Sequence, residues 1–117
     1  MSDKTYTPDT WTVVKVINGE KFYYRILAGW GGGYTYGASW KLSSGIEQIV
    51  EEDDRYVISN ASGSTYVCRK GAPQHTSYTM SILKGFQGDI GVENIFEEPI
   101  EEAILYLEYL KTNGAVA

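Results

Sequence analysis

The fold of this chain is decided by the stretch WTVVKVINGEKFYYRIL, residues 11–27. Two runs rich in β-branched and aromatic residues flank Asn18-Gly19, which is the strongest short signal for a β-hairpin because a type I′ turn needs positive φ at both central positions. A turn there pairs Val13 with Tyr24. This register gathers five apolar side chains on one face: Trp11, Val13, Phe22, Tyr24 and Ile26. The sequence therefore predicts an antiparallel hairpin with one buried face.

Further segments have the composition of strands and are separated by turn residues. They are residues 34–42, Ile46–Glu51, residues 56–60 and residues 64–70. Ala61-Ser62-Gly63 joins the last two into a second hairpin. Residues 76–86 fit a strand or a short helix, and we favour a strand. The expected sheet is mostly antiparallel and has about five or six strands.

The C-terminal region has the pattern of an amphipathic helix that begins at Pro99. Apolar residues recur at spacings of three and four: Ile100, Ala103, Ile104, Leu107 and Leu110. Four carboxylates lie at the positive end of the helix dipole: Glu97, Glu98, Glu101 and Glu102. Asn113-Gly114 provides the stop. We therefore expect an α+β fold in which this helix packs on one face of the sheet.

The domain organisation follows from length and local composition. Residues 1–9 are polar and contain Pro8, so we expect a flexible N-terminal arm before a single domain over residues 10–117. No apolar run approaches the roughly 18 residues that span a bilayer, and the N-terminus lacks the apolar core of a signal peptide. We expect a cytoplasmic protein without membrane contact.

Composition argues against several kinds of chemistry. The net charge of −5 disfavours a nucleic-acid partner, which would require a basic surface. Cys68 and His75 are the single cysteine and histidine, so we expect no disulfide and no zinc site. We interpret Cys68 as a small buried hydrophobe and not as a nucleophile. No catalytic constellation or phosphate loop is present, so we expect neither enzymatic activity nor a cofactor.

Two surfaces are candidates for binding. The first is the tract GWGGGYTYGASW, residues 29–40, where Trp30, Tyr34 and Tyr36 could anchor a partner beside a glycine-rich loop. The alternative interpretation is an ordinary loop followed by a core strand. The second is an acidic turn, composed of Glu51, Glu52, Asp53 and Asp54. It is either a solvated turn or a surface that steers association with a basic partner.

Three segments of the chain resemble small uncharacterised accessory proteins of tailed phages. They are WKLSSGI at residues 40–46, RYVI at residues 55–58 and SGSTYVC at residues 62–68. The resemblance covers roughly a quarter of the chain and implies a viral context, with the host cytoplasm as the location. Small acidic phage proteins are often stoichiometric inhibitors of host machinery, so it implies an inhibitor by analogy.

The leading hypothesis is a non-enzymatic protein-binding module, a phage-encoded inhibitor of a host defence protein with a basic surface. A second hypothesis is a small-ligand protein that sequesters a nucleotide or sugar in a pocket lined by Trp30, Tyr34 and Tyr36. A third is a homo-oligomeric structural component, such as a homodimer. The surface around Trp30 distinguishes the first two hypotheses. A concave surface favours the small-ligand protein, because ligand pockets are concave and largely pre-formed, and a flat surface favours the protein-binding module.

Overall fold

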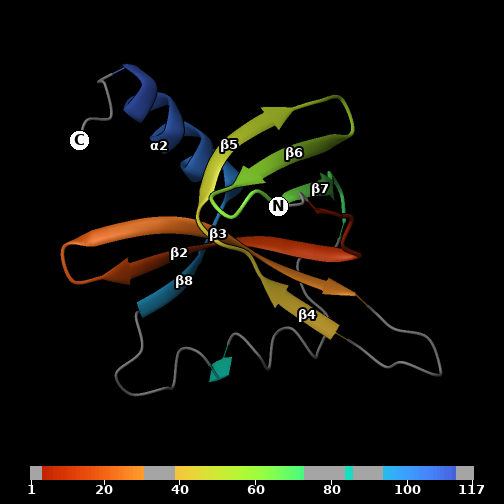
Figure 1. Ribbon diagram of the computed structural model, residues 1–117, viewed down its shortest axis with the longest axis horizontal. Helices are drawn as coiled ribbons and strands as arrows, with labels where there is room; N and C mark the ends of the chain where they lie inside the picture. The colour runs from red at the N-terminus through yellow and green to blue at the C-terminus, as the bar shows by residue number, and fades with distance from the viewer. Residues whose placement is uncertain (1–3, 31–38, 73–83, 86–93, 113–117) are drawn as a thin grey trace.

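The computed structural model describes residues 4–30, 39–72, 84–85 and 94–112. Strands and one helix follow one another along these residues: β1 Thr5–Tyr6, β2 Thr10–Asn18, β3 Lys21–Trp30, β4 Ser39–Leu42, β5 Ile46–Glu51, β6 Arg55–Asn60, β7 Thr65–Arg69, β8 Asn94–Glu98 and α2 Ile100–Thr112. The fold is mainly sheet with one C-terminal helix, as expected (Figure 1).

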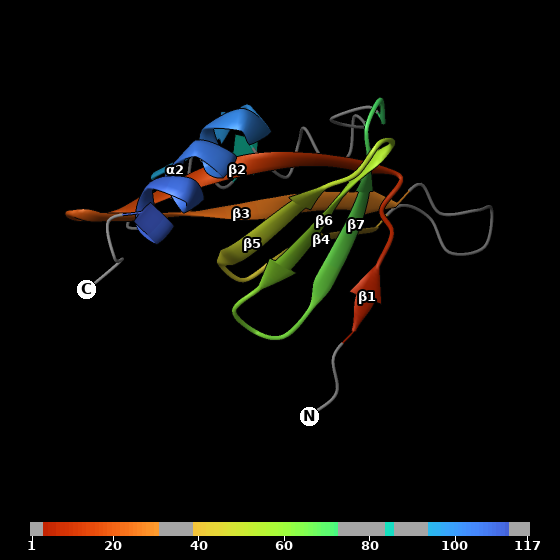
Figure 2. The ribbon, with the colours of Figure 1, turned by 90° about the horizontal axis from the view of Figure 1, so that it is seen from above.

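The described strands form two four-stranded sheets and not one sheet of five or six strands. Their orders are β1-β7-β6-β5 and β4-β3-β2-β8. Seen from above, the strands of one sheet run at a steep angle to those of the other (Figure 2). The chain crosses between the sheets at the turn Ser43-Ser44-Gly45, where Ser43 Oγ accepts a hydrogen bond from the main-chain nitrogen of Ile26. An alternating pattern predicts strands but does not state which strands are neighbours, so this division was not predictable locally.

The β2–β3 hairpin divides its side chains between two faces as predicted, but its register differs. Phe22 of the predicted buried face is 36% exposed, and the opposite face is buried as well, through Val14 and Val16. Val13 pairs with Ile26 and Asn18 pairs with Lys21, so the turn residues are Gly19 and Glu20. Gly19 has a φ of 65°, which glycine adopts without steric cost. The predicted pairing was wrong by two residues, and an even shift leaves every side chain on its predicted face.

Residues 4–9 pack against the rest of the domain, which corrects the expected loose arm. Strand β1 pairs with β7 in parallel, Thr5 beside Thr65. The main-chain nitrogen of Thr65 donates a hydrogen bond of 2.8 Å to the carbonyl of Lys4, and Pro8 is fully buried. Two strand residues beside a proline give no periodic signal, so local pattern could not predict this pairing.

The main core lies between the two sheets. It gathers Val13, Tyr24, Ile26 and Ala28 from one sheet and Ile46, Tyr56, Ile58, Tyr66 and Cys68 from the other. Ile100 and Ala103 of α2 complete it. A second apolar cluster, Val14, Val16, Leu27 and Ile95, lies on the opposite face of the β4-β3-β2-β8 sheet.

Helix α2 has the predicted bounds to within one residue, but its setting differs from the expected one. It contacts both β2 and β5, and so it bridges the two sheets instead of covering one face of a single sheet. Strand β8, which the sequence interpretation did not include, pairs with β2 and leads directly into the helix. In the segment 76–86, Lys84 and Gly85 are helical, against the strand that we favoured, and its other residues lie outside the described part. No helix among the described residues is long and apolar enough to cross a membrane.

Candidate functional site

Trp30 does not lie in a loop, because β3 continues through Gly29 to Trp30, which pairs with Ser39 of β4. Its side chain packs against the main core, lies edge-on to Tyr6 at 6.1 Å between ring centroids, and donates from Nε1 to the carbonyl of Thr7 at 3.1 Å. These contacts attach the N-terminal segment to the sheet.

Tyr34 and Tyr36, the other aromatic residues of the predicted glycine-rich surface, lie outside the described residues.

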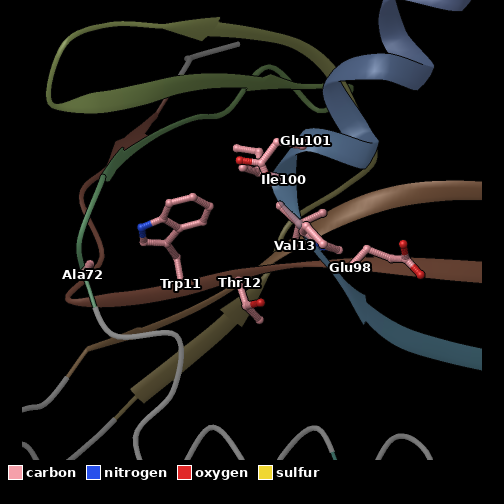
Figure 3. A pocket seen from close by; sticks show the side chains of 8 residues that line it. Trp11, Thr12, Val13, Ala72, Glu98, Ile100 and Glu101 are labelled. Atoms are coloured by element: carbon pink, nitrogen blue, oxygen red, sulfur yellow. The ribbon is translucent and has the colours of Figure 1, made fainter.

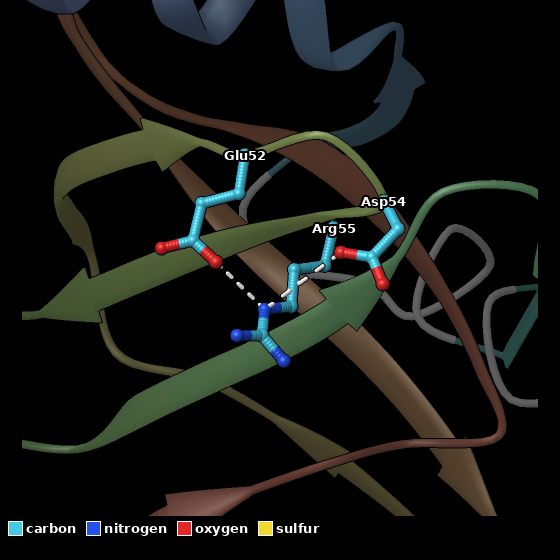
Figure 4. A network of polar contacts seen from close by, with 3 residues as sticks. All are labelled: Glu52, Asp54 and Arg55. Atoms are coloured by element: carbon cyan, nitrogen blue, oxygen red, sulfur yellow. Dashed lines mark hydrogen bonds and ion pairs between the residues drawn. The ribbon is translucent and has the colours of Figure 1, made fainter.

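The acidic turn connects β5 to β6, and all four of its side chains are exposed. Arg55 Nε lies 2.7 Å from a carboxylate oxygen of Glu52 and 4.0 Å from one of Asp54 (Figure 4). Lys70 Nζ lies 2.6 Å from a carboxylate oxygen of Glu51. Exposed ion pairs of this kind contribute little to stability. They neutralise part of the turn and leave it with a net negative charge.

A pocket of about 230 Å³ lies at the end of the core where α2 begins. Trp11, Val13 and Ile100 supply its apolar wall, while Glu98 and Glu101 supply carboxylates. The Glu101 carboxylate points toward the indole of Trp11, whereas that of Glu98 points away from it (Figure 3). The pocket therefore combines an aromatic face with at least one facing negative charge.

Trp11 is held in this position by contacts with the opposite sheet. Its Nε1 donates to the carbonyl of Arg69 on β7 at 2.8 Å, and its ring lies edge-on to Tyr56 of β6 at 5.8 Å between centroids. Lys70 Nζ lies 5.1 Å from the Tyr56 ring centroid, so that ring already contacts a cation of the chain itself.

One carboxylate of the turn and one of the helix act on the same aromatic residue, Tyr56. Burial raises the pKa of Tyr56, and the negative charges of Glu51 and Glu101 raise it further while Lys70 opposes them. The two acidic groups therefore flank Tyr56. We call the combined region the acid–aromatic surface: Trp11, Tyr56, Glu51, Glu98 and Glu101.

The sequence analysis identified residues of this surface separately but did not predict that they lie together. The interpretation assigned Trp11 to the hairpin core, which it packs against, and the glutamates to the start of the helix. The second assignment is correct for Glu101 and Glu102, whereas Glu97 and Glu98 lie in strand β8. The missed signal was the run Ile95-Phe96 before Pro99, which predicts a short strand and would have placed Glu98 beside the hairpin.

Cys68 is fully buried, as predicted for a small apolar residue. Burial raises the pKa of its thiol to about 12, so the reactive thiolate is not populated near neutral pH. His75, its conceivable partner, lies outside the described residues. Among the described residues, no group of three or more histidine, cysteine or acidic side chains could hold a metal ion.

Comparison with known proteins adds no relative: the chain matches no protein-family model, no curated protein and no solved structure.

Proposed function

We propose that this chain is a non-enzymatic protein-binding module whose acid–aromatic surface receives a lysine or arginine side chain of a basic partner. The observation that carries the proposal is the pocket in which Glu101 faces Trp11. Lysine and arginine have an apolar stem and a charged head. The stem matches the wall of Val13 and Ile100, and the head matches the indole face and the carboxylate.

The size of the pocket supports a side chain over a drug-sized ligand. Its volume of about 230 Å³ is below the roughly 300–1,000 Å³ of typical small-molecule sites. Trp30 is not among the residues that line it, so the proposed nucleotide or sugar pocket around Trp30 receives no support from this cavity.

The charges around the pocket support a steering role for the acidic turn. Glu51 lies next to Tyr56 on the same surface, and Asp53 and Asp54 extend the negative charge outward. Such fields accelerate encounter with a basic partner. The resemblance to accessory proteins of tailed phages makes a host protein the partner that we propose, and inhibition the role.

The test is a titration of the labelled protein with an octalysine peptide, followed through the indole N–H resonance of Trp11. We expect a saturable shift of that resonance, which octaglutamate does not produce. Replacing Glu98 and Glu101 with glutamine should weaken binding by about fivefold, since a cation–π or exposed ionic contact contributes roughly 1 kcal/mol.

The matched control replaces Glu20 and Glu108 with glutamine, because both are exposed and removing them changes the net charge by the same amount. An equal loss of affinity in the control would show that only net charge matters, and the pocket would then have no role. A basic host protein that wild type retains should likewise be released by the Glu98 and Glu101 variant.

A further inference from the structure

A second pocket, of about 310 Å³, lies at the opposite end of strands β6 and β7 from the acid–aromatic surface. Its polar lining comes from three separate parts of the chain. Lys41 and Ser44 come from β4 and the following turn, Ser62 and Ser64 from the loop between β6 and β7, and Tyr66 from β7. None of the described residues that line it carries a carboxylate.

The three serine hydroxyls form a chain with a surplus proton. Ser44 Oγ accepts from the main-chain nitrogen of Ser62 at 3.0 Å and donates to Ser62 Oγ at 3.0 Å. The hydroxyls of Ser62 and Ser64 lie 3.2 Å apart, and either can be the donor. The three hydroxyl groups have three protons, but the two hydrogen bonds between them use only two of these protons. One proton remains, on Ser62 or Ser64, as an available donor polarised by the chain.

Tyr66 adds a second donor. Its side chain is 1% exposed and lines the pocket. Burial raises the pKa of Tyr66 to about 12, so this hydroxyl keeps its proton at neutral pH. Because Tyr66 lines the pocket, its protonated hydroxyl can donate a hydrogen bond to a bound acceptor.

Lys41 adds a positive charge. Its Nζ lies 5.3 Å from the ring centroid of Tyr6, and it forms no ion pair with the carboxylates that the structure describes. Arg55 and Lys70, by contrast, are paired with the acidic turn. An unneutralised ammonium beside surplus hydroxyl protons makes this pocket rich in donors within a chain of net charge −5.

We propose that this pocket binds an oxyanion, such as a phosphate, a sulfate or a carboxylate group, through Lys41, Tyr66 and the Ser62–Ser64 pair. Charge-assisted hydrogen bonds to such groups are stronger than hydrogen bonds between two neutral groups. The ring of Tyr6 is already contacted by Tyr66 at 5.0 Å and by Trp30 at 6.1 Å between centroids, so stacking of a base or a sugar is disfavoured. The oxyanion is either a free inorganic ion or the anionic group of a small organic molecule.

The experiment titrates the ¹⁵N-labelled protein with sodium phosphate and, separately, with sodium chloride at equal ionic strength. We expect saturable amide shifts at Lys41, Ser62 and Ser64 with phosphate and none with chloride. A parallel titration with phenyl phosphate identifies the source, because tighter binding of the ester indicates a small organic ligand and equal binding indicates a free ion. An absence of saturation with both phosphates, or an equal response to chloride, overturns the proposal.

Two variants test the residues, and a third is the control. Lys41→Gln and Tyr66→Phe should each weaken phosphate binding by at least about tenfold, while Lys21→Gln, at an exposed lysine that begins β3, should not. Tyr66→Phe keeps the ring that contacts Tyr6 and removes only the hydroxyl, so the unliganded protein should remain about as stable as wild type. A Tyr66→Phe protein that is less stable yet binds phosphate normally would overturn the assignment of that hydroxyl.

Discussion

The indole Nε1 of Trp11, on β2, donates a hydrogen bond of 2.8 Å to the main-chain oxygen of Arg69, on β7. This bond joins two residues that are 58 positions apart and connects the two sheets directly. It also fixes the orientation of the ring that forms the wall of the candidate pocket. Packing of the core and presentation of the acid–aromatic surface therefore depend on the same side chain.

Trp11→Phe should reduce the free energy of unfolding by about 1 kcal/mol, the usual net contribution of one hydrogen bond. The phenyl ring keeps most of the contact with Tyr56. Urea denaturation measures the change. If Trp11→Phe is as stable as wild type, the bond to Arg69 does not hold the sheets together.

Trp30→Ala should destabilise the protein by about 2–4 kcal/mol, since a large, partly buried ring is removed. It should also release residues 4–9, because the contacts of Trp30 with Thr7 and Tyr6 are lost. Amide exchange at Thr65, whose nitrogen bonds to Lys4, should then accelerate. An unchanged melting temperature together with unchanged exchange at Thr65 would instead restore Trp30 as a free anchor for a partner.

Ile100→Ala should cost about 2–4 kcal/mol, because this side chain is buried in the main core. Leu105→Ala, on the same helix but 60% exposed, is the control and should change stability by less than about 0.5 kcal/mol. Ile104 is half-buried and should fall between them. Equal effects at Ile100 and Leu105 would contradict the bridging position of α2.

Stability should fall in alkaline solution. Burial raises the pKa of Cys68 from 9.0, and that of Tyr66 from 10.0, to about 12 in each case. The folded state therefore holds these protons more tightly than the unfolded state. The resulting contribution to the free energy of unfolding is complete below pH 9 and is lost as the pH rises toward 12. Each group contributes a slope of about 1.4 kcal/mol per pH unit within its own window.

Cys68→Ala distinguishes the two groups. Its free energy of unfolding should stay level between pH 9 and pH 10, where only the thiol titrates, and should fall above pH 10. Urea denaturation at each pH provides the measurement, and a wild-type curve that is level up to pH 11 would refute the assignment.

Asp53→Asn combined with Asp54→Asn should slow association with octalysine several-fold at low salt and flatten its salt dependence, because exposed charges act through a field that salt screens. Stability should change by less than about 0.5 kcal/mol. Stopped-flow mixing measures the rate, with the Glu20 and Glu108 glutamine variant as the control. Identical rates in the two variants would show that the acidic turn has no special position.

The local sequence pattern was sufficient to predict strands that pair with the next strand in the sequence, and helices whose apolar residues recur at a regular spacing. The β2–β3 and β6–β7 hairpins join adjacent strands through turn residues, and α2 has a clear apolar spacing. Strand β8 pairs with β2 across about 80 residues, and no local preference encodes such a partner. The same holds for β1, whose two residues are too few for a period.

The candidate site was less predictable, because its residues come together only after both sheets have packed. Trp11, Ala72 and Glu101 line one pocket although they are far apart in the sequence. Each has a sufficient local explanation, as hairpin core, turn or helix start. Convergence of such residues is a property of the topology, which single-sequence reasoning did not determine.

The burial of Cys68 provides a way to measure how often the folded protein opens transiently. Because it is the single cysteine and lies fully enclosed between the sheets, a thiol reagent can modify it only when that interface separates. The labelling rate, measured without denaturant, then reports how often the two sheets part, in the manner of native-state exchange at a single site. Occupancy of either pocket should lower this rate, so a simple chemical reaction can detect ligands and partners without a measurement of activity.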